Sequence, residues 1–193
     1  MAKQSVFVGE VYQSKKCGPF KVVSYTSANE VMVRFVNTGY EVMVHTGAIK
    51  KGQIKDKLIP SVEGVGIVGD GDFPLSYFCS EKGRMVKHPV YTLWTGMLTR
   101  CYNRKYQNRH TSYIGCEVAP EWRNYQDFFL TVRGVPGFDK WCDYQLGLSD
   151  DQYALDKDKL VEGNRLYSPS TCCFITVEEN SLLAVKAKLE KFQ

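Results

Sequence analysis

The sequence predicts an α+β protein, with a small, barrel-like N-terminal antiparallel β domain followed by an α+β domain that ends in two strands and a helix. Three observations predict it. Apolar and polar residues alternate before residue 46, apolar residues recur at helical spacing after Pro89, and a glycine-rich stretch separates the two patterns. With 193 residues, 44% of them hydrophobic, the chain can bury a core in each part.

Strand-like alternation defines the N-terminal domain, residues 1–60. The runs 20–25, 30–36 and 40–45 each place alternate apolar residues on one face, and residues 37–39 between the last two runs predict a hairpin loop. Small curled sheets of this kind dock nucleic acids or other proteins. Nine basic against four acidic residues favour nucleic acid slightly, and docking of a host or phage protein on this sheet stays open.

Residues 61–80 are predicted to be a glycine-rich linker region, and residues 81–193 form the second domain. Pro89 begins a helix whose apolar residues fall on one stripe, and a second helix is predicted over 120–132 with Gly134 as its stop signal. The core residues expected from these helices are Val90, Trp94, Met97, Leu98 and Cys101 in the first, and Trp122, Tyr125, Phe128, Phe129 and Val132 in the second.

Positive charge gathers around the C-terminal end of the first helix. The net charge is only +4, but segment 81–110 has seven basic residues and one acidic residue, whereas 111–163 has ten acidic and five basic residues. This distribution suits a phosphate-facing side, although two solvated faces of opposite sign would look the same. The tyrosines between the cations suit either base stacking or packing. The candidate nucleic-acid-binding residues are Lys87, Arg100, Tyr102, Arg104, Lys105, Tyr106 and Arg109.

The last forty residues are predicted to form a hairpin and a helix. Strands over 152–160 and 165–168 would flank a turn at 162–164. Thr176 is the expected N-cap of the final helix, and Glu179 completes a capping box. The apolar stripe of that helix would consist of Leu182, Val185, Leu189 and Phe192.

Five short fragments occur here in the order expected of one family. They are Tyr91-x-x-Trp94-x-x-Met97-x-x-Arg100-Cys101-Tyr102, Tyr113-x-Gly115-Cys116-x-Val118 with Glu121-Trp122, Leu155-Asp-Lys-Asp158, Gly163-Asn164 with Tyr167-Ser-Pro169 and Cys172-Cys173-Phe174, and Glu179-Asn180. Over about residues 88–181, roughly half of the chain, the sequence resembles the HNH-type (ββα-metal) endonuclease-like proteins of bacteriophages. The resemblance implies a C-terminal unit of two strands and a helix, and a place in the cytoplasm of an infected bacterial cell.

The resemblance also implies a catalytic site. In that family an Asp-His pair ends the first strand, the Asp binding or orienting a metal and the His activating water, and a second ligand comes from the helix. These roles fall on Asp156, Lys157 and Asn180, with Asp158 as a further oxygen ligand for Mg²⁺ or Mn²⁺. Asn164 would be the asparagine that ties the loop.

Lysine in place of histidine is the departure from the family pattern. With a reference pKa of about 10.4, a lysine stays protonated at neutral pH and is a poor base. Lys157 is then either an unusual base or a cation that holds a phosphate. The alternative without a function is that 156–158 are surface residues of a hairpin. Whether the chain is an enzyme therefore stays open at this stage.

Three functions follow. The first is a nucleic-acid-binding protein of HNH ancestry that has lost catalysis and contacts DNA or RNA; the second is an active metal-dependent endonuclease or nickase. The third is a phage factor that docks on host machinery. No apolar run reaches 18 residues and the N-terminus lacks a signal-peptide pattern, so we predict no membrane partner. The seven scattered cysteines predict reduced, mostly buried thiols.

Overall fold

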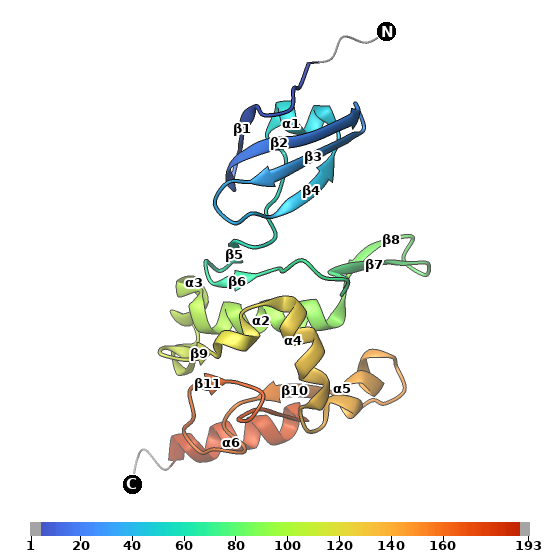
Figure 1. Cartoon of the computed structure of the whole chain (residues 1–193). Coiled ribbons are helices and arrows are strands. Elements are labelled where there is room, and N and C mark those ends of the chain that lie inside the picture. Colours follow the sequence, from blue (N-terminus) through green and yellow to red (C-terminus); the bar gives the residue numbers. More distant parts are fainter. Residues whose placement is uncertain (1–4, 190–193) are drawn as a thin grey trace. The chain divides into compact units, whose positions relative to one another are not determined.

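The computed structural model describes residues 5–189 and divides into two compact units, residues 1–59 and 60–193. Both units mix strands with helices, as an α+β protein should (Figure 1). None of the helices within the described residues is long and apolar enough to cross a membrane.

The N-terminal unit is a four-stranded antiparallel meander closed by a short helix. Its sheet has the order β1-β2-β3-β4, and the core includes Phe20, Val22, Val33 and Phe35. The predicted sheet is confirmed, but among the described residues β1 and β4 do not pair, so no closed barrel is found. The elements are β1 (Val11–Ser14), β2 (Gly18–Ser27), β3 (Glu30–Phe35), β4 (Glu41–Val44) and α1 (Thr46–Lys51).

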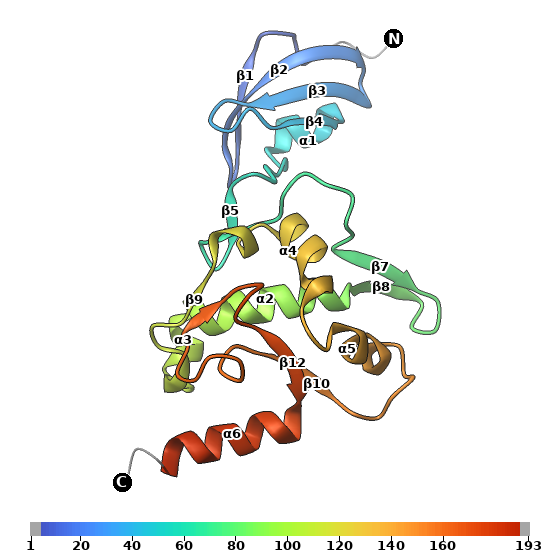
Figure 2. The same cartoon turned by 60° about the horizontal axis from the view of Figure 1, so that its bottom comes forward.

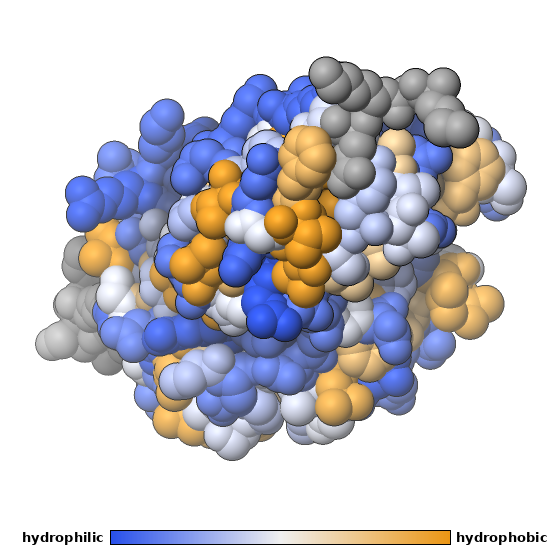
Figure 3. Space-filling model, turned by 45° about the horizontal axis from the view of Figure 1, so that its top comes forward, coloured by the Kyte–Doolittle hydropathy of each residue, from blue (hydrophilic) through white to orange (hydrophobic). Residues whose placement is uncertain are grey.

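Several apolar side chains of this unit remain exposed. With the N-terminal unit turned toward the viewer, Figure 3 shows hydrophobic groups in orange lying among hydrophilic ones in blue. Exposed aliphatic residues scattered among polar ones are common on protein surfaces and do not by themselves indicate a partner. The exposed large apolar residues are Phe7, Val8, Val11, Val23, Val36, Met43 and Leu58.

The second unit is built around α2 (Pro89–Tyr102), whose predicted apolar stripe is buried as expected. The N-terminal part of this unit contains two small antiparallel pairs of strands. Gly66, in one of these strands, lies so close to α2 that a Cβ added to it would come 2.4 Å from Leu98 Cδ1. The glycine there permits close packing of a strand on the helix. The pairs are β5 (Pro60–Val62) with β6 (Gly66–Ile67), and β7 (Ser76–Cys79) with β8 (Arg84–Lys87).

The predicted helix over 120–132 is divided into shorter pieces. Asn124 accepts a hydrogen bond from the Gln126 N–H and so caps a new helix in the middle of the predicted one. All five predicted core residues are nevertheless buried, and Trp94 Nε1 donates to Trp122 O at 2.8 Å. The pieces are η2 (Pro120–Trp122), α4 (Tyr125–Thr131) and η3 (Val132–Gly134), preceded by α3 (Arg104–Gln107), η1 (Thr111–Tyr113) and β9 (Glu117–Val118) and followed by α5 (Phe138–Gln145).

The C-terminal strands pair differently from the prediction. β10 (Tyr153–Asp156) pairs antiparallel with β12 (Cys173–Thr176), while β11 (Leu166–Tyr167) pairs parallel with β9. The predicted hairpin between 152–160 and 165–168 is therefore wrong, because the second run finds its partner in β9. Figure 2 shows β10 beside β12, which leads directly into α6 (Val177–Leu189).

Helix α6 is capped as predicted but does not pack as predicted. Thr176 Oγ1 accepts the Glu179 N–H at 3.1 Å, which is the expected cap. Leu182 and Val185 are 65% and 55% exposed, so the predicted stripe is not buried where it is described. The Leu189 and Phe192 side chains lie outside the described part of the chain. The seven cysteines are free thiols, four of them buried, as the sequence predicted.

Candidate functional site

The end of β10 carries Asp156, which the sequence placed in a catalytic site. Its carboxylate is buried and accepts two backbone N–H groups, from Asp158 at 2.7 Å and from Lys159 at 2.6 Å, both through Oδ2. A carboxylate that accepts two backbone donors fixes the turn that follows the strand. The observed bonds of Asp156 are thus those of a turn-forming residue.

Lys157 points inward rather than into solvent. Only 7% of the residue is exposed, and its Nζ donates to both carboxylate oxygens of Asp158, at 2.7 and 2.6 Å. Nζ also lies 6.0 Å from the ring centroid of Tyr167, within the range of a cation–π contact. The Lys157 side chain is therefore held by its neighbours Asp158 and Tyr167.

Asn164 joins the two ends of the loop after β10. Its Nδ2 donates to the Lys157 and Leu166 carbonyl oxygens at 2.8 and 2.7 Å, and its Oδ1 accepts the Leu166 N–H at 3.1 Å. These three bonds match the loop-tying role expected from the resemblance.

On α6, Glu179 rather than Asn180 interacts with the β10 loop. Lys159 Nζ pairs with Glu179 Oε1 at 2.6 Å, and this hydrogen bond raises the pKa of Lys159. The Asn180 side chain makes no hydrogen bond to a described residue. The structure thus brings Asp156, Lys157 and Asp158 together at one strand end, and from α6 it is Glu179, not the predicted metal ligand Asn180, that contacts this loop.

A divalent cation does not fit among these groups as they stand. Mg²⁺ and Mn²⁺ require several oxygen ligands, which must be free of other cations. Here the carboxylates of Asp158 and Glu179 are each paired with a lysine ammonium, which would repel a metal ion. In the described part of the chain, no three His, Cys, Asp or Glu side chains gather so as to hold a metal.

Arg100, by contrast, has no carboxylate partner. Its Nε is buried without a hydrogen-bond partner, and its guanidinium carbon lies 5.9 and 5.6 Å from the ring centroids of Tyr113 and Tyr167. Burial raises the pKa of both tyrosines and raises that of Cys101 to about 12, so all three stay neutral at pH 7. The positive charge of Arg100 is therefore not offset by any ion pair among the described residues.

The remaining predicted cations are on the surface. Arg104, Lys105 and Arg109, in and after α3, are exposed and form no ion pair within residues 5–189. Lys87 is also exposed, at the end of β8. Because they are solvated and lack acidic partners, these side chains are free to meet phosphates.

The predicted tyrosines have structural partners. The Tyr102 hydroxyl accepts the Val118 N–H at 3.0 Å, and the Tyr106 ring stacks on His110 at a centroid distance of 4.4 Å. Both residues are half-buried. Packing, which the sequence left as the alternative to base stacking, therefore accounts for their observed contacts.

The β7–β8 hairpin was not predicted from the sequence. It projects from the helices of the second unit in both views (Figures 1 and 2). Phe78 and Met85 are cross-strand partners, 64% and 59% exposed, and Tyr77 is 45% exposed. Lys82 and Arg84 lie at its tip and are exposed as well. The turn signal at Gly83 was available, but the first strand fell inside the stretch assigned as linker.

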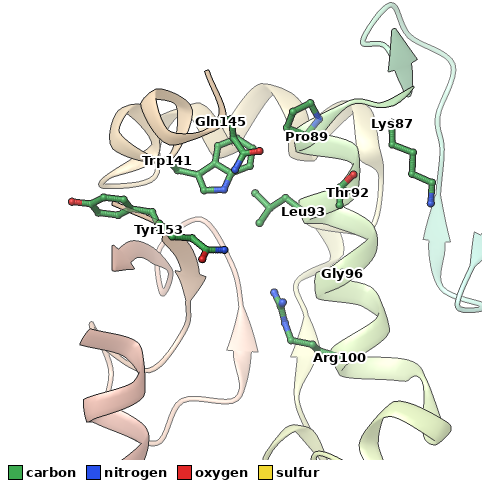
Figure 4. A pocket seen from close by; sticks show the side chains of 10 residues that line it. Lys87, Pro89, Thr92, Leu93, Gly96, Arg100, Trp141, Gln145 and Tyr153 are labelled. Atoms are coloured by element: carbon green, nitrogen blue, oxygen red, sulfur yellow. The ribbon is translucent and has the colours of Figure 1, made fainter. Parts of the chain in front are cut away.

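A groove beside α2 was also missed, because it is formed by residues far apart in sequence. Its volume is about 320 Å³, and it is lined by Lys87, Pro89, Thr92, Leu93, Gly96, Arg100, Trp141, Gln145, Gln152 and Tyr153. Figure 4 shows Leu93 and Arg100 reaching from α2 toward the side that carries Trp141 and Tyr153. Such a mixture of cationic, aromatic and amide side chains suits an anionic ligand with an aromatic part.

Comparison of this chain with protein-family models, with curated proteins and with solved structures found no match. Its function must therefore follow from the residues and their geometry. The second unit offers cations without acidic partners, a groove beside them and an exposed apolar hairpin, while Asp158 and Glu179 near the end of β10 are paired with lysines.

Proposed function

We propose that this chain is a phage-encoded nucleic-acid-binding protein of HNH-endonuclease ancestry, which holds the phosphate backbone and no longer cleaves it. The ancestry is supported by β10, β12 and α6, two antiparallel strands followed by a helix, with Asp156 at the end of the first strand. Asn164 supports it further by tying the intervening loop.

The loss of cleavage rests on one observation. Lys157 lies at the position of the family's general base. Its Nζ donates two hydrogen bonds to the carboxylate of Asp158. A protonated lysine cannot accept a proton from water, and the paired carboxylate is not free for a metal. Among the described residues at this strand end, the position of the base is taken by a paired lysine and the carboxylate of Asp158 is engaged, which supports the loss of cleavage.

Binding is supported by the cations along α2. Lys87 and Arg104 flank this helix of 14 residues, which at 1.5 Å per residue is about 21 Å long. With roughly 3.4 Å per base pair, about six base pairs of a duplex span that length. The exposed Phe78 and Met85 on the β7–β8 hairpin would lie against bases or sugars at one end of this track.

The first experiment tests binding and cleavage together. Purified protein is incubated with plasmid DNA and with single-stranded RNA in Mg²⁺, Mn²⁺ or EDTA, and analysed by gel shift and for nicking. We expect a shift that weakens with salt and no nicking under any condition. Metal-dependent nicking that disappears in Asp156→Asn, which keeps an acceptor oxygen for the two backbone N–H groups, would establish an endonuclease instead. Failure to shift either polymer at low salt would leave the protein-docking function.

The second experiment locates the contacts. Arg104→Ala, Lys105→Ala and Arg109→Ala are combined, and the control combines Lys50→Ala, Lys51→Ala and Lys55→Ala, three exposed lysines of the N-terminal unit. We expect the first variant to lose affinity about tenfold or more for all sequences alike, and its salt slope to fall by about three. The control should change less. A loss confined to one sequence would contradict phosphate contacts.

A further inference from the structure

The groove beside α2 has the size and walls of a small-ligand site. Its volume of about 320 Å³ is at the lower end of the range, about 300–1,000 Å³, that ligand pockets occupy. One wall comes from α2, through Thr92, Leu93 and Gly96, and the facing wall includes Trp141 and Tyr153 (Figure 4). The side chains that line it lie within the second unit alone.

Arg100 borders this groove with an uncompensated charge. A Cβ added to Gly96, one helical turn earlier, would lie 4.0 Å from Arg100 Nη1, and apart from the adjoining helix backbone it would meet no other described atom within 4 Å. The Arg100 Nε has no partner, and the tyrosines beside the guanidinium are neutral. Arg100 is half-buried, lines the groove and has no counter-charge, so an anion in the groove that met the accessible part of its guanidinium would complete the site.

The rest of the lining selects the kind of anion. The half-buried Tyr153 offers aromatic surface, which a free inorganic anion would not use, and Trp141 adds only the small part of its ring that is exposed, since it packs on Phe138 and Phe174. Gln145 and Gln152 each carry an amide that can both donate and accept, as the polar edge of a base requires. A nucleotide combines a phosphate with a planar aromatic group that has polar edges, and so meets all three demands of the lining.

We infer that the groove takes a single nucleotide of a bound strand, unstacked from its neighbours, with its phosphate on Arg100 and its base toward Trp141 and Tyr153. This inference rests on the proposed function and adds a base-contacting site to it. Recognition of unstacked bases by aromatic and amide groups is the usual mode for single strands. The α3 cations would hold the adjoining phosphates.

Gly96 allows a test that blocks the groove without weakening the fold. In Gly96→Glu the new carboxylate stands one turn before Arg100, where it can pair with the guanidinium and occupy the phosphate position. Gly96→Ala adds only the Cβ and is the matched control. Both replacements favour the helix over glycine, so urea unfolding of both variants should show stability at or above that of the wild type.

Binding is measured by fluorescence anisotropy with a labelled single-stranded thymidine oligonucleotide and an abasic oligonucleotide of the same length. We expect the wild type to bind the thymidine strand at least fivefold more tightly than the abasic strand, and Gly96→Ala, which adds only a Cβ to the wall, to fall between the wild type and Gly96→Glu. Gly96→Glu should bind the thymidine strand at least tenfold more weakly and lose the preference between the strands.

The outcomes separate the two proposals. If the wild type binds both strands but Gly96→Glu equals Gly96→Ala, the groove site is overturned and backbone binding stands. If the wild type binds thymidine and abasic strands equally, the base contact is overturned. If the wild type binds neither strand, and also fails to shift plasmid, the proposed function itself fails.

Discussion

Two charged regions of the second unit differ in whether their cations have acidic partners. At the end of β10, Lys157 and Lys159 each donate to a carboxylate of the same structural unit, at 2.6 Å. Along α2 and α3, Arg100 and Arg104 have no acidic partner among the described residues. Charges paired internally stabilise one conformation, whereas charges left unpaired favour an external anion.

At the end of β10 the carboxylates have structural partners, because Asp156 holds a turn and Asp158 holds a lysine. Under the proposed function, this strand end would be what remains of a nuclease site, and the unpaired cations would form the binding surface. The cations that are not engaged lie instead on and around α2.

The largest expected effect is that of removing the turn-forming carboxylate. Asp156→Ala leaves two backbone N–H groups without their acceptor at a buried position. We expect a loss of about 3 kcal/mol in the free energy of unfolding, measured with urea. Asp151→Ala, at an exposed aspartate before β10, is the control and should stay within about 0.5 kcal/mol of the wild type. Equal effects would mean that the carboxylate does not hold the turn.

The next effect is that of the loop tie. Asn164→Ala removes three hydrogen bonds that join the Lys157 and Leu166 backbone, so we expect a loss of about 2 kcal/mol. Asn164→Asp keeps the acceptor for the Leu166 N–H and loses both donors, and should fall between the wild type and the alanine variant. An unchanged urea midpoint in both variants would show that the loop is held by other contacts.

Local patterns in the sequence predicted what local contacts determine. The stripe of α2 from Val90 to Cys101 is buried as expected, because 3.6-residue spacing alone places those residues on one face. The same holds for the alternation in β3 and for the Thr176 cap. Each of these features depends on neighbours only a few residues away.

Long-range pairing could not be predicted from those patterns. Asp156 lies opposite Cys173 in the sheet, across a loop that contains a strand of its own, and nothing in residues 165–168 indicates that β9 is their partner. The roles of Asp156 and Lys157 were equally hidden, since a sequence does not show which donor a carboxylate accepts. The groove could not be predicted either, because residues that line it, such as Leu93 and Tyr153, are sixty positions apart in the sequence.

A third effect concerns the N-terminal end of α2, in the region of unpaired cations. His88 Nδ1 accepts the Val90 N–H at 3.2 Å, and burial, together with the charge of Arg133, lowers the pKa of His88. The pKa of an unperturbed histidine is about 6.5. Just below that pH, the unfolded state therefore binds more protons than the folded state. The contribution of neutral His88 to the free energy of unfolding is fully present above about pH 6.5. It is lost as the pH falls toward the lowered pKa of His88 in the folded state.

The size of this effect is that of a helix cap, about 1 kcal/mol. We expect the thermal midpoint of the wild type to fall more between pH 7 and pH 5 than that of His88→Asn, which can cap the helix but cannot be protonated. The difference between the two proteins across this range is the readout. Parallel curves would show that His88 does not titrate with folding.

The smallest effect is expected from the exposed ion pair at the end of β10. The Lys159 and Glu179 side chains are 42% and 41% exposed, so water screens their attraction, whereas Lys157 is only 8% exposed on its side chain. We therefore expect Lys159→Ala to leave the urea midpoint within experimental error, and Lys157→Ala to lower it by removing buried packing against Tyr167. If Lys159→Ala lowered the midpoint as much, internal pairing of exposed charges would hold α6 on the sheet, and burial would not distinguish the two lysines.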